Sequence, residues 1–250
     1  MRPVAVVTGA RRGIGYACAE ALAQAGFDLA VTDLEEDRAV AAGLEALGAS
    51  VLFLRSDLAR IEEHAATAEA IRARFGLVHC LVNNAGISAP ARGDLLDLSA
   101  ENFDRVMAVN LRGTVFWTQA LVPLLLAAPA DRPRTIINVT SVSAVMSSPD
   151  RLDYCMSKAA LSAFSQGLAL RLAPEGITVF ELRPGIIRTD MTAKVAERYD
   201  GAIAAGLVPA GRWGEPGDIG RIAASLAGGA FAFATGSVIH ADGALSIPRL

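Results

Sequence analysis

The stretch Val4-Ala5-Val6-Val7-Thr8-Gly9-Ala10-Arg11-Arg12-Gly13-Ile14-Gly15 decides the fold. A short β-branched apolar run leads into a glycine-rich turn, and a segment of helical composition follows and stops at Gly26. Glycines in such a turn let the backbone approach a pyrophosphate, which the N–H groups and dipole of the following helix bind. The spacing is G-x-x-x-G-x-G, which alone is a weak signal and also suits a turn without a ligand.

The rest of the chain alternates between strand and helix patterns. Strands are predicted at residues 4–8, 29–32, 51–54, 78–82, 135–139, 177–182 and 237–240. Helices are predicted at 14–25, 35–47, 61–75, 154–172 and 215–227, with one long or two shorter helices within 99–126. Strands that are apolar on both faces and separated by helices indicate a parallel sheet covered on both sides. We therefore predict an α/β fold: one Rossmann-type doubly wound domain over residues 1–250, with a seven-stranded, mainly parallel sheet and residues 188–212 as a substrate lid.

Composition narrows the class of protein. With 250 residues, 52% of them hydrophobic, the chain can bury a large core and is not intrinsically disordered. A net charge of −3 gives no electrostatic footprint for nucleic acid. Two charge-poor stretches, 113–130 and 222–241, carry proline or glycine and are expected in the core, not in a membrane.

Cysteine and histidine usage points to a cytoplasmic enzyme without a catalytic metal. The three cysteines are sparse, which suits reduced thiols, and the apolar run after Pro3 is too short for a signal peptide. The histidines form no ligand pattern with carboxylates. These residues are Cys18, Cys80, Cys155, His64, His79 and His240.

Asp33 ends the second predicted strand, 18 residues after Gly15, near the spacing of an acid that binds the adenine ribose. Such a carboxylate accepts hydrogen bonds from the ribose hydroxyls and repels a 2′-phosphate, which favours NAD over NADP. Arg11 and Arg12 favour NADP instead, because a guanidinium in the glycine turn could bind that phosphate. Asp33 could also be a solvated acid at a strand end. We weigh its position more heavily and predict NAD, with NADP as the alternative.

A second group of residues suggests proton transfer. Tyr154 and Lys158 stand four residues apart on a predicted helix and so share a face. A phenol is a poor base near neutrality, and an ammonium beside it favours the phenolate. Ser141 follows the fifth predicted strand, at the carboxyl edge where ligands bind. The alternatives are an ordinary surface pair and a serine that only caps a turn.

With these motifs the chain resembles the short-chain dehydrogenase/reductase family over nearly its whole length, and is most similar to 3-oxoacyl-[acyl-carrier-protein] reductases. The matching positions are Thr8, Gly9, Gly13, Gly15, Asp57, Asn83-Asn84-Ala85-Gly86, Asn110, Ser141, Tyr154, Lys158, Pro184-Gly185 and Thr189. The resemblance implies interconversion of a ketone and a secondary alcohol by hydride transfer. In this reaction the cofactor carries the hydride and the protein supplies position and a proton.

The resemblance also implies roles. Tyr154 would be the acid or base, Lys158 would bind the nicotinamide ribose and lower the Tyr154 pKa, and Ser141 would polarise the carbonyl. Asn110 would hold a water that connects Lys158 to solvent, or would merely bend its helix. Asn84 would lie along the adenosine, or would only brace the sheet. The implied cofactor-binding residues are Gly9, Arg11, Arg12, Gly13, Ile14, Gly15, Asp33, Leu34, Asp57, Leu58, Asn84, Ala85, Gly86, Tyr154, Lys158, Pro184, Gly185, Ile187 and Thr189.

The sequence says less about the substrate than about the reaction. The family members that reduce 3-oxoacyl thioesters offer bases to an acidic carrier protein, and Arg132 and Arg134 are the candidates here. Glu175 is an acid where such enzymes tend to have a base. An NAD-linked dehydrogenase of a small secondary alcohol, sugar or polyol therefore stays open, and a silent dinucleotide-binding redox sensor is a weaker alternative because Asn110, Ser141, Tyr154 and Lys158 are all present.

The lid and the assembly are further expectations. In the lid, Met191, Val195, Ile203, Leu207 and Val208 accompany Lys194, Arg198 and Arg212, and the apolar set would line a substrate pocket or pack on the core. The family is typically tetrameric, so we expect a homotetramer, with residues 222–233 and the tail 244–250 buried against a neighbour or packed within the chain.

Overall fold

Seven strands form one sheet in the order β3-β2-β1-β4-β5-β6-β7, and every pair of neighbours is parallel. The computed structural model describes residues 2–193 and 195–249. The strands are β1 (Val4–Thr8), β2 (Asp28–Asp33), β3 (Val51–Arg55), β4 (Cys80–Asn83), β5 (Thr135–Val139), β6 (Thr178–Pro184) and β7 (Val238–Ala241). The chain runs outward from β1 to β3, returns to the other side of β1 and continues outward to β7. The predicted doubly wound fold is confirmed, and the sheet is parallel throughout.

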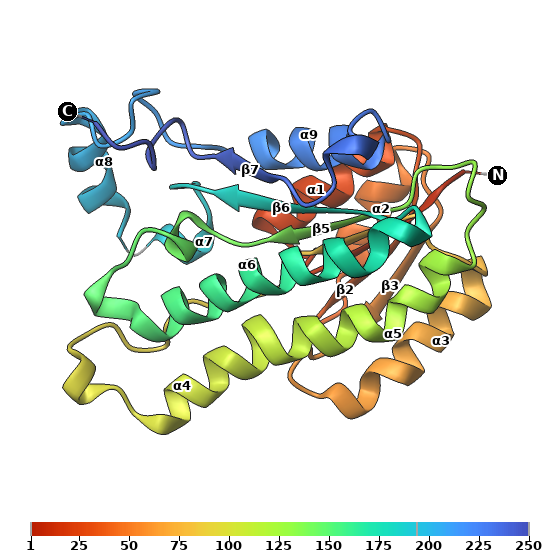
Figure 1. The fold of residues 1–250 in the computed structure, drawn as a ribbon, viewed down its shortest axis with the longest axis horizontal. Coiled ribbons are helices and arrows are strands. Elements are labelled where there is room, and N and C mark those ends of the chain that lie inside the picture. Colours follow the sequence, from red (N-terminus) through yellow and green to blue (C-terminus); the bar gives the residue numbers. More distant parts are fainter. Residues whose placement is uncertain (1, 194, 250) are drawn as a thin grey trace.

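Helices cover both faces of this sheet (Figure 1). One layer holds α1 (Gly13–Gln24), α2 (Arg38–Glu45) and α9 (Pro216–Ala227), and the other holds α3 (His64–Phe75), α4 (Ala100–Met107), α5 (Thr114–Leu126) and α6 (Leu152–Leu172). Side chains of β1 alternate between the layers, with Ala5 and Val7 in one core cluster and Val6 in the other. This two-sided burial explains why β1 is apolar at every position. Within the described ranges, none of the helices has the length and apolar composition needed to cross a membrane.

Two helix predictions need correction. The helix expected at 35–47 is α2, which begins only at Arg38, because the Asp37 carboxylate caps it by accepting hydrogen bonds from the N–H groups of Ala39 (3.0 Å) and Val40 (3.2 Å). The segment expected at 61–75 begins with one 3₁₀ turn, η1 (Ile61–Glu63), before α3. Glu35 and Glu36 therefore belong to the loop after β2.

Residues 100–126 form one continuous helical rod with a π-helical segment, η3 (Ala108–Gly113), between α4 and α5. Ser99 caps its start through a hydrogen bond from the N–H of Asn102 (3.2 Å). Such π segments often occur at functional sites, and Asn110 lies within this one.

The carboxyl ends of the strands converge on one edge of the sheet, which lies on the left in Figure 1. Two short helices of the segment predicted as a lid, α7 (Asp190–Ala193) and α8 (Ala196–Ala204), lie at this edge (Figure 1). In an open doubly wound sheet the ligand crevice lies outside the strands where the direction of winding reverses, here between β1 and β4.

Candidate active site

The backbone geometry of the turn after β1 explains its three glycines. Gly9 and Gly13 have φ values of +66° and +57°, in the left-handed region that favours glycine. A Cβ on Gly15 would lie 2.0 Å from the carbonyl oxygen of Gly9, so the first turn of α1 packs directly on the turn that precedes it. All three glycines are thus required by backbone geometry.

This cradle fits a dinucleotide. No side chain caps α1, whose N-cap residue is Arg12, so the first N–H groups of the helix remain available to an anion. Thr189 lies across from the turn, with its Cγ2 3.5 Å from the position of a Cβ on Gly13. Gly13, Ile14 and Gly15 would therefore hold a pyrophosphate, with Thr189 facing it.

Asn84 braces this cradle. Its Nδ2 donates hydrogen bonds to the carbonyl oxygens of Thr8 (2.9 Å) and Gly9 (3.2 Å). The hydroxyl of Thr8 accepts from the N–H groups of Asn84 and Ala85, both at 3.0 Å. The bracing role that the sequence left open for Asn84 is therefore present.

Asp33 lies beside the turn, and the nearby arginines are paired. Its carboxylate accepts from the N–H of Arg11 (3.0 Å) and of Leu34 (2.8 Å). The guanidinium of Arg11 binds Glu35 at 2.5 Å, and that of Arg12 binds Asp190 at the start of α7 at 2.9 Å. Both guanidinium groups thus have carboxylate partners. The Asp33 carboxylate, in contrast, binds backbone N–H groups, one of them in the glycine turn.

The other residues proposed for the cofactor are distributed along the same edge. Asp57 accepts from the N–H of Ala59 (2.9 Å), Leu58 is buried, and Leu34 is exposed. A Cβ on Gly86 would lie 3.2 Å from Asn110 Oδ1 and 3.6 Å from Lys158 Nζ. After β6, which ends at Pro184, Gly185 packs on Asp242, and the buried Ile187 pairs with Gly214.

Ser141 and Tyr154 form the centre of the site. Ser141 follows β5, and its hydroxyl accepts from the N–H of Ser143 (3.1 Å), so it also caps a 3₁₀ turn, η4 (Val142–Ala144). Its side chain shares a hydrogen bond with that of Tyr154, which is 8% exposed. Burial raises the pKa of Tyr154, while the Ser141 hydrogen bond and the charges of Arg151 and Arg92 lower it. A hydroxyl donor and a phenol therefore stand side by side at the carboxyl edge of the sheet.

Lys158 shares the helix face of Tyr154 and is buried. Its Nζ lies 5.8 Å from the Tyr154 ring centroid and donates a hydrogen bond to the carbonyl oxygen of Val139 (3.1 Å). Burial lowers the pKa of Lys158 to about 8, and the negative charge of Glu181 partly opposes this. Burial raises the pKa of Tyr154 above its ordinary value. The expected lowering of this pKa by Lys158 stays a prediction.

Asn110 projects from the π-helical segment toward the same place. Its Oδ1 accepts from the N–H of Ile87 (2.8 Å), and its Nδ2 donates to the carbonyl oxygen of Ile87 (2.9 Å) and to Ser157 Oγ (3.1 Å). This side chain connects the loop after β4 to α6, one residue before Lys158. The structure thus brings together Asn110, Ser141, Tyr154 and Lys158.

The charged residues proposed for a carrier protein lie elsewhere. Arg134 immediately precedes β5, so the length of β5, about 16 Å, separates it from Ser141. It is buried, and its guanidinium donates to the carbonyl oxygens of Glu175 (2.5 Å) and Ala128 (3.5 Å). Arg132 and Glu175 lie at this same amino edge of the sheet. These residues therefore do not lie beside the site of their own chain, because a parallel strand separates the residues that precede it from those that follow it.

Part of the lid segment packs on the chain itself. Ile203 and Val208 are buried in a cluster with Val142, Trp213 and Leu245, and Leu245 brings the C-terminal tail into contact with the lid. Met191, Leu207 and Arg198 are exposed, Val195 is half-buried, and Arg212 pairs with Asp218 at 2.7 Å. Lys194 and Leu250 lie outside the described residues.

One buried network was missed by sequence reasoning. Glu181 on β6 accepts hydrogen bonds from Thr140 Oγ1 (2.7 Å), Ser162 Oγ (2.7 Å) and Arg183 Nε (2.8 Å). Both ions of the Glu181–Arg183 pair are buried. The signal was present in the sequence, because two opposite charges alternate with apolar residues inside an otherwise apolar strand.

The fold and these side chains define a dinucleotide-binding oxidoreductase. The chain belongs to the short-chain dehydrogenase/reductase family, since a family model described as Enoyl-(Acyl carrier protein) reductase matches residues 9–246. It is 36% identical over 245 residues to 3-oxoacyl-[acyl-carrier-protein] reductase FabG of Escherichia coli (strain K12), covering 97% of this chain and 96% of that one.

Two solved structures extend the comparison. The crystal structure of a 3-oxoacyl-[acyl-carrier protein] reductase from Brucella melitensis in complex with NAD is 62% identical, with a TM-score of 0.98 over 100% of this chain and 99% of that one. A gluconate 5-dehydrogenase from Burkholderia cenocepacia, in complex with NADP and tartrate, is 28% identical, with a TM-score of 0.91 over 99% of this chain and 96% of that one.

Proposed function

We propose that the protein interconverts a ketone and a secondary alcohol with NAD, and that Tyr154 is the acid or base. The observation that carries this proposal is the placement of Ser141 after β5 and of the buried Tyr154 on α6, at the edge of the sheet that also holds the glycine cradle. The bound nicotinamide would supply or accept the hydride. Ser141 would hold and polarise the carbonyl, Tyr154 would exchange the proton at its oxygen, and Lys158 would hold the nicotinamide ribose with Asn110 close by.

The first candidate substrate is a 3-oxoacyl thioester. The relatives support it, because the E. coli and B. melitensis proteins are both named 3-oxoacyl-[acyl-carrier-protein] reductases. The second candidate is a small secondary alcohol, sugar or polyol. The similarity of this chain to a gluconate 5-dehydrogenase supports it. Arg134 is buried at the amino edge of the sheet, away from Ser141, which removes one argument for docking of a carrier protein beside the site of the same chain.

A substrate panel separates the two candidates. Acetoacetyl thioesters and polyols are assayed with NAD(H) and NADP(H), and turnover is measured by nicotinamide absorbance at 340 nm, the usual wavelength. We expect turnover with NAD(H) and preference for one of the two classes. Turnover of neither class with either cofactor would contradict the proposed function.

NAD preference follows from Asp33. A carboxylate beside the adenine ribose repels a 2′-phosphate, and Arg11 and Arg12 are engaged elsewhere. Asp33→Asn keeps an oxygen that can accept from the N–H groups of Arg11 and Leu34 but removes the charge. We expect the ratio of kcat/KM for NAD over NADP to fall about ten-fold or more, which corresponds to about 1.4 kcal/mol.

The matched control is Glu45→Gln, which removes a charge at the end of α2. It should leave the cofactor ratio unchanged. A wild-type enzyme that prefers NADPH, or an Asp33→Asn variant with an unaltered ratio, would contradict this assignment.

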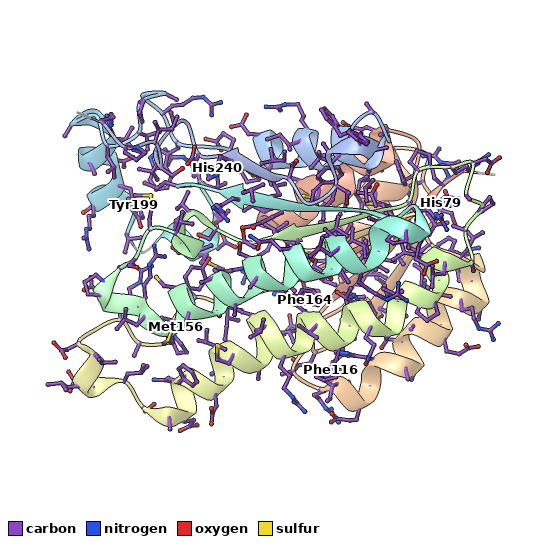
Figure 2. All side chains as sticks on the ribbon, in the orientation of Figure 1. His79, Phe116, Met156, Phe164, Tyr199 and His240 are labelled. Atoms are coloured by element: carbon purple, nitrogen blue, oxygen red, sulfur yellow. The ribbon has the colours of Figure 1, made fainter. Side chains whose placement is uncertain are left out.

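We further propose a homotetramer in the cytoplasm. Large apolar side chains are exposed on two separate parts of the surface: Phe116 and Met156 on α5 and α6 (Figure 2), and Phe231 and Phe233 just after α9. A cavity of about 630 Å³ between α9 and β7 adjoins Phe231. Two such surfaces are what a dimer of dimers needs. The three cysteines form no disulfide, which suits a reducing compartment.

A further inference from the structure

Two arginines stand next to the proposed proton donor. Arg151 immediately precedes α6, and its guanidinium carbon lies 5.2 Å from the ring centroid of Tyr154. Arg92 belongs to the loop between β4 and α4, is exposed, and lines one cavity together with Arg151. Two positive charges from two different loops thus face the same cavity, and one of them lies over the Tyr154 ring.

The two loops are held together by the backbone. The N–H of Gly93 donates a hydrogen bond to the carbonyl oxygen of Asp150 (3.1 Å). A cavity of about 100 Å³ lies between the loops, and Arg92 and Arg151 both line it. The backbones that carry these two arginines are therefore joined beside the cavity.

Within residues 2–193 and 195–249, neither arginine forms an ion pair with a protein carboxylate. Other arginines at this edge differ, because Arg12 binds Asp190 and Arg212 binds Asp218. Acids do lie on the same loops. Asp94 accepts from the N–H of Leu96 (2.8 Å), and Asp153, which is 1% exposed, accepts from the N–H of Tyr154 (2.7 Å).

The remaining acids of the cavity wall, Asp97 and Asp150, also form no ion pair with either arginine in the described chain. Guanidinium groups bind carboxylates with directed, charge-assisted hydrogen bonds. Two of them beside a reacting carbonyl would fix the orientation of an anionic substrate.

We propose that Arg92 and Arg151 bind a carboxylate of the substrate while its carbonyl or alcohol group lies on Ser141 and Tyr154. The substrate class is therefore a small oxo acid or hydroxy acid whose carboxylate is only a few bonds from the reacting carbon. A carrier-bound thioester fits less well, because its thioester is neutral and its phosphate is many bonds away. This inference rests on the proposed function and makes its substrate more specific.

The test compares matched anionic and neutral compounds. Acetoacetate is paired with ethyl acetoacetate, and gluconate with sorbitol, in the wild type, in Arg92→Gln/Arg151→Gln and in the control Arg74→Gln, which removes an exposed charge on α3. We expect the double variant to raise KM for at least one anion ten-fold or more while KM for its neutral partner changes little. Because both charges also act on Tyr154, any change in kcat should be the same for the anion and for its neutral partner. Arg74→Gln should behave as the wild type.

A binding measurement makes the test independent of turnover. Calorimetric titration of acetoacetate and gluconate into Tyr154→Phe with bound dinucleotide should show binding that is lost when both arginines are also replaced. Equal losses of affinity for the anion and its neutral partner, or no loss of affinity for either anion, would overturn the inference. Acetoacetyl-CoA is titrated as a third probe. If the double variant lost affinity for acetoacetyl-CoA alone, the arginines would bind a phosphate and the inference would also be overturned. Absence of turnover in the wild type with retained anion binding would overturn the proposed function and leave the carboxylate site standing.

Discussion

Replacing Tyr154 with phenylalanine is expected to lower kcat by about 10²–10⁴-fold, the usual contribution of a positioned acid or base. The ring stays, so the packing of α6 beside Ser141 and Lys158 should be retained. What disappears is the hydroxyl that shares a hydrogen bond with Ser141. Steady-state kinetics gives kcat, and fluorescence titration of NADH should give a Kd within about two-fold of the wild type, a difference far below 1 kcal/mol.

Tyr16→Phe is the matched control, since Tyr16 lies on α1 and packs against the core beside Gly43. It should keep wild-type kcat. Wild-type turnover in Tyr154→Phe would remove Tyr154 from the mechanism, and a large loss of NADH binding would assign it a structural role instead.

Glu181→Ala is expected to destabilise the fold by on the order of 3–5 kcal/mol. The substitution leaves the Arg183 guanidinium buried without its carboxylate and removes the acceptor of the Thr140 and Ser162 hydroxyls. Urea or thermal unfolding measures the change. Glu69→Ala, which breaks an exposed pair with Arg72 on α3, should change stability far less because water solvates both partners.

An apolar replacement of the whole pair, Glu181→Leu/Arg183→Met, should recover most of this loss, because neither charge then remains unpaired. Similar stabilities for Glu181→Ala and Glu69→Ala would contradict the assignment of the network as a buried ion pair.

The milder Glu181→Gln variant should change the pH dependence. The Glu181 charge stabilises the Lys158 ammonium, which opposes the effect of burial on the Lys158 pKa. Without that charge the pKa of Lys158 should fall below its value of about 8. If the ammonium is needed to hold the cofactor, the alkaline limb of kcat/KM moves to lower pH, whereas an unchanged profile would separate Glu181 from Lys158.

Local sequence patterns predicted the sheet well. The bounds of β1 and β5 match the predicted residues, because short β-branched runs between turn residues leave little freedom. The start of α2 was misplaced, because the predicted range 35–47 includes Asp37, which is the cap of the helix. Helix boundaries depend on such single hydrogen bonds, which periodicity does not show.

The site was predicted in part. The glycine turn and the Tyr154–Lys158 spacing depend on neighbours in the sequence, and the residues do lie together. Arg132 and Arg134 do not lie beside the site of their own chain, because their place at the amino edge of the sheet follows only from the direction of β5. Arg92 and Arg151 were passed over, because 59 positions separate them in the chain and only the folded loops bring them to one cavity.

By itself, the sequence determined the fold class, the glycine cradle and the helix face that carries Tyr154 and Lys158, because each follows from spacing along one or two neighbouring elements. Only the tertiary structure decided the charge environment of these groups. Burial raises the pKa of Tyr154 and lowers that of Lys158, and the charge of Glu181 opposes the second of these shifts. Electrostatic energies depend on distance in space and on exclusion of water, and both exist only once the chain has folded.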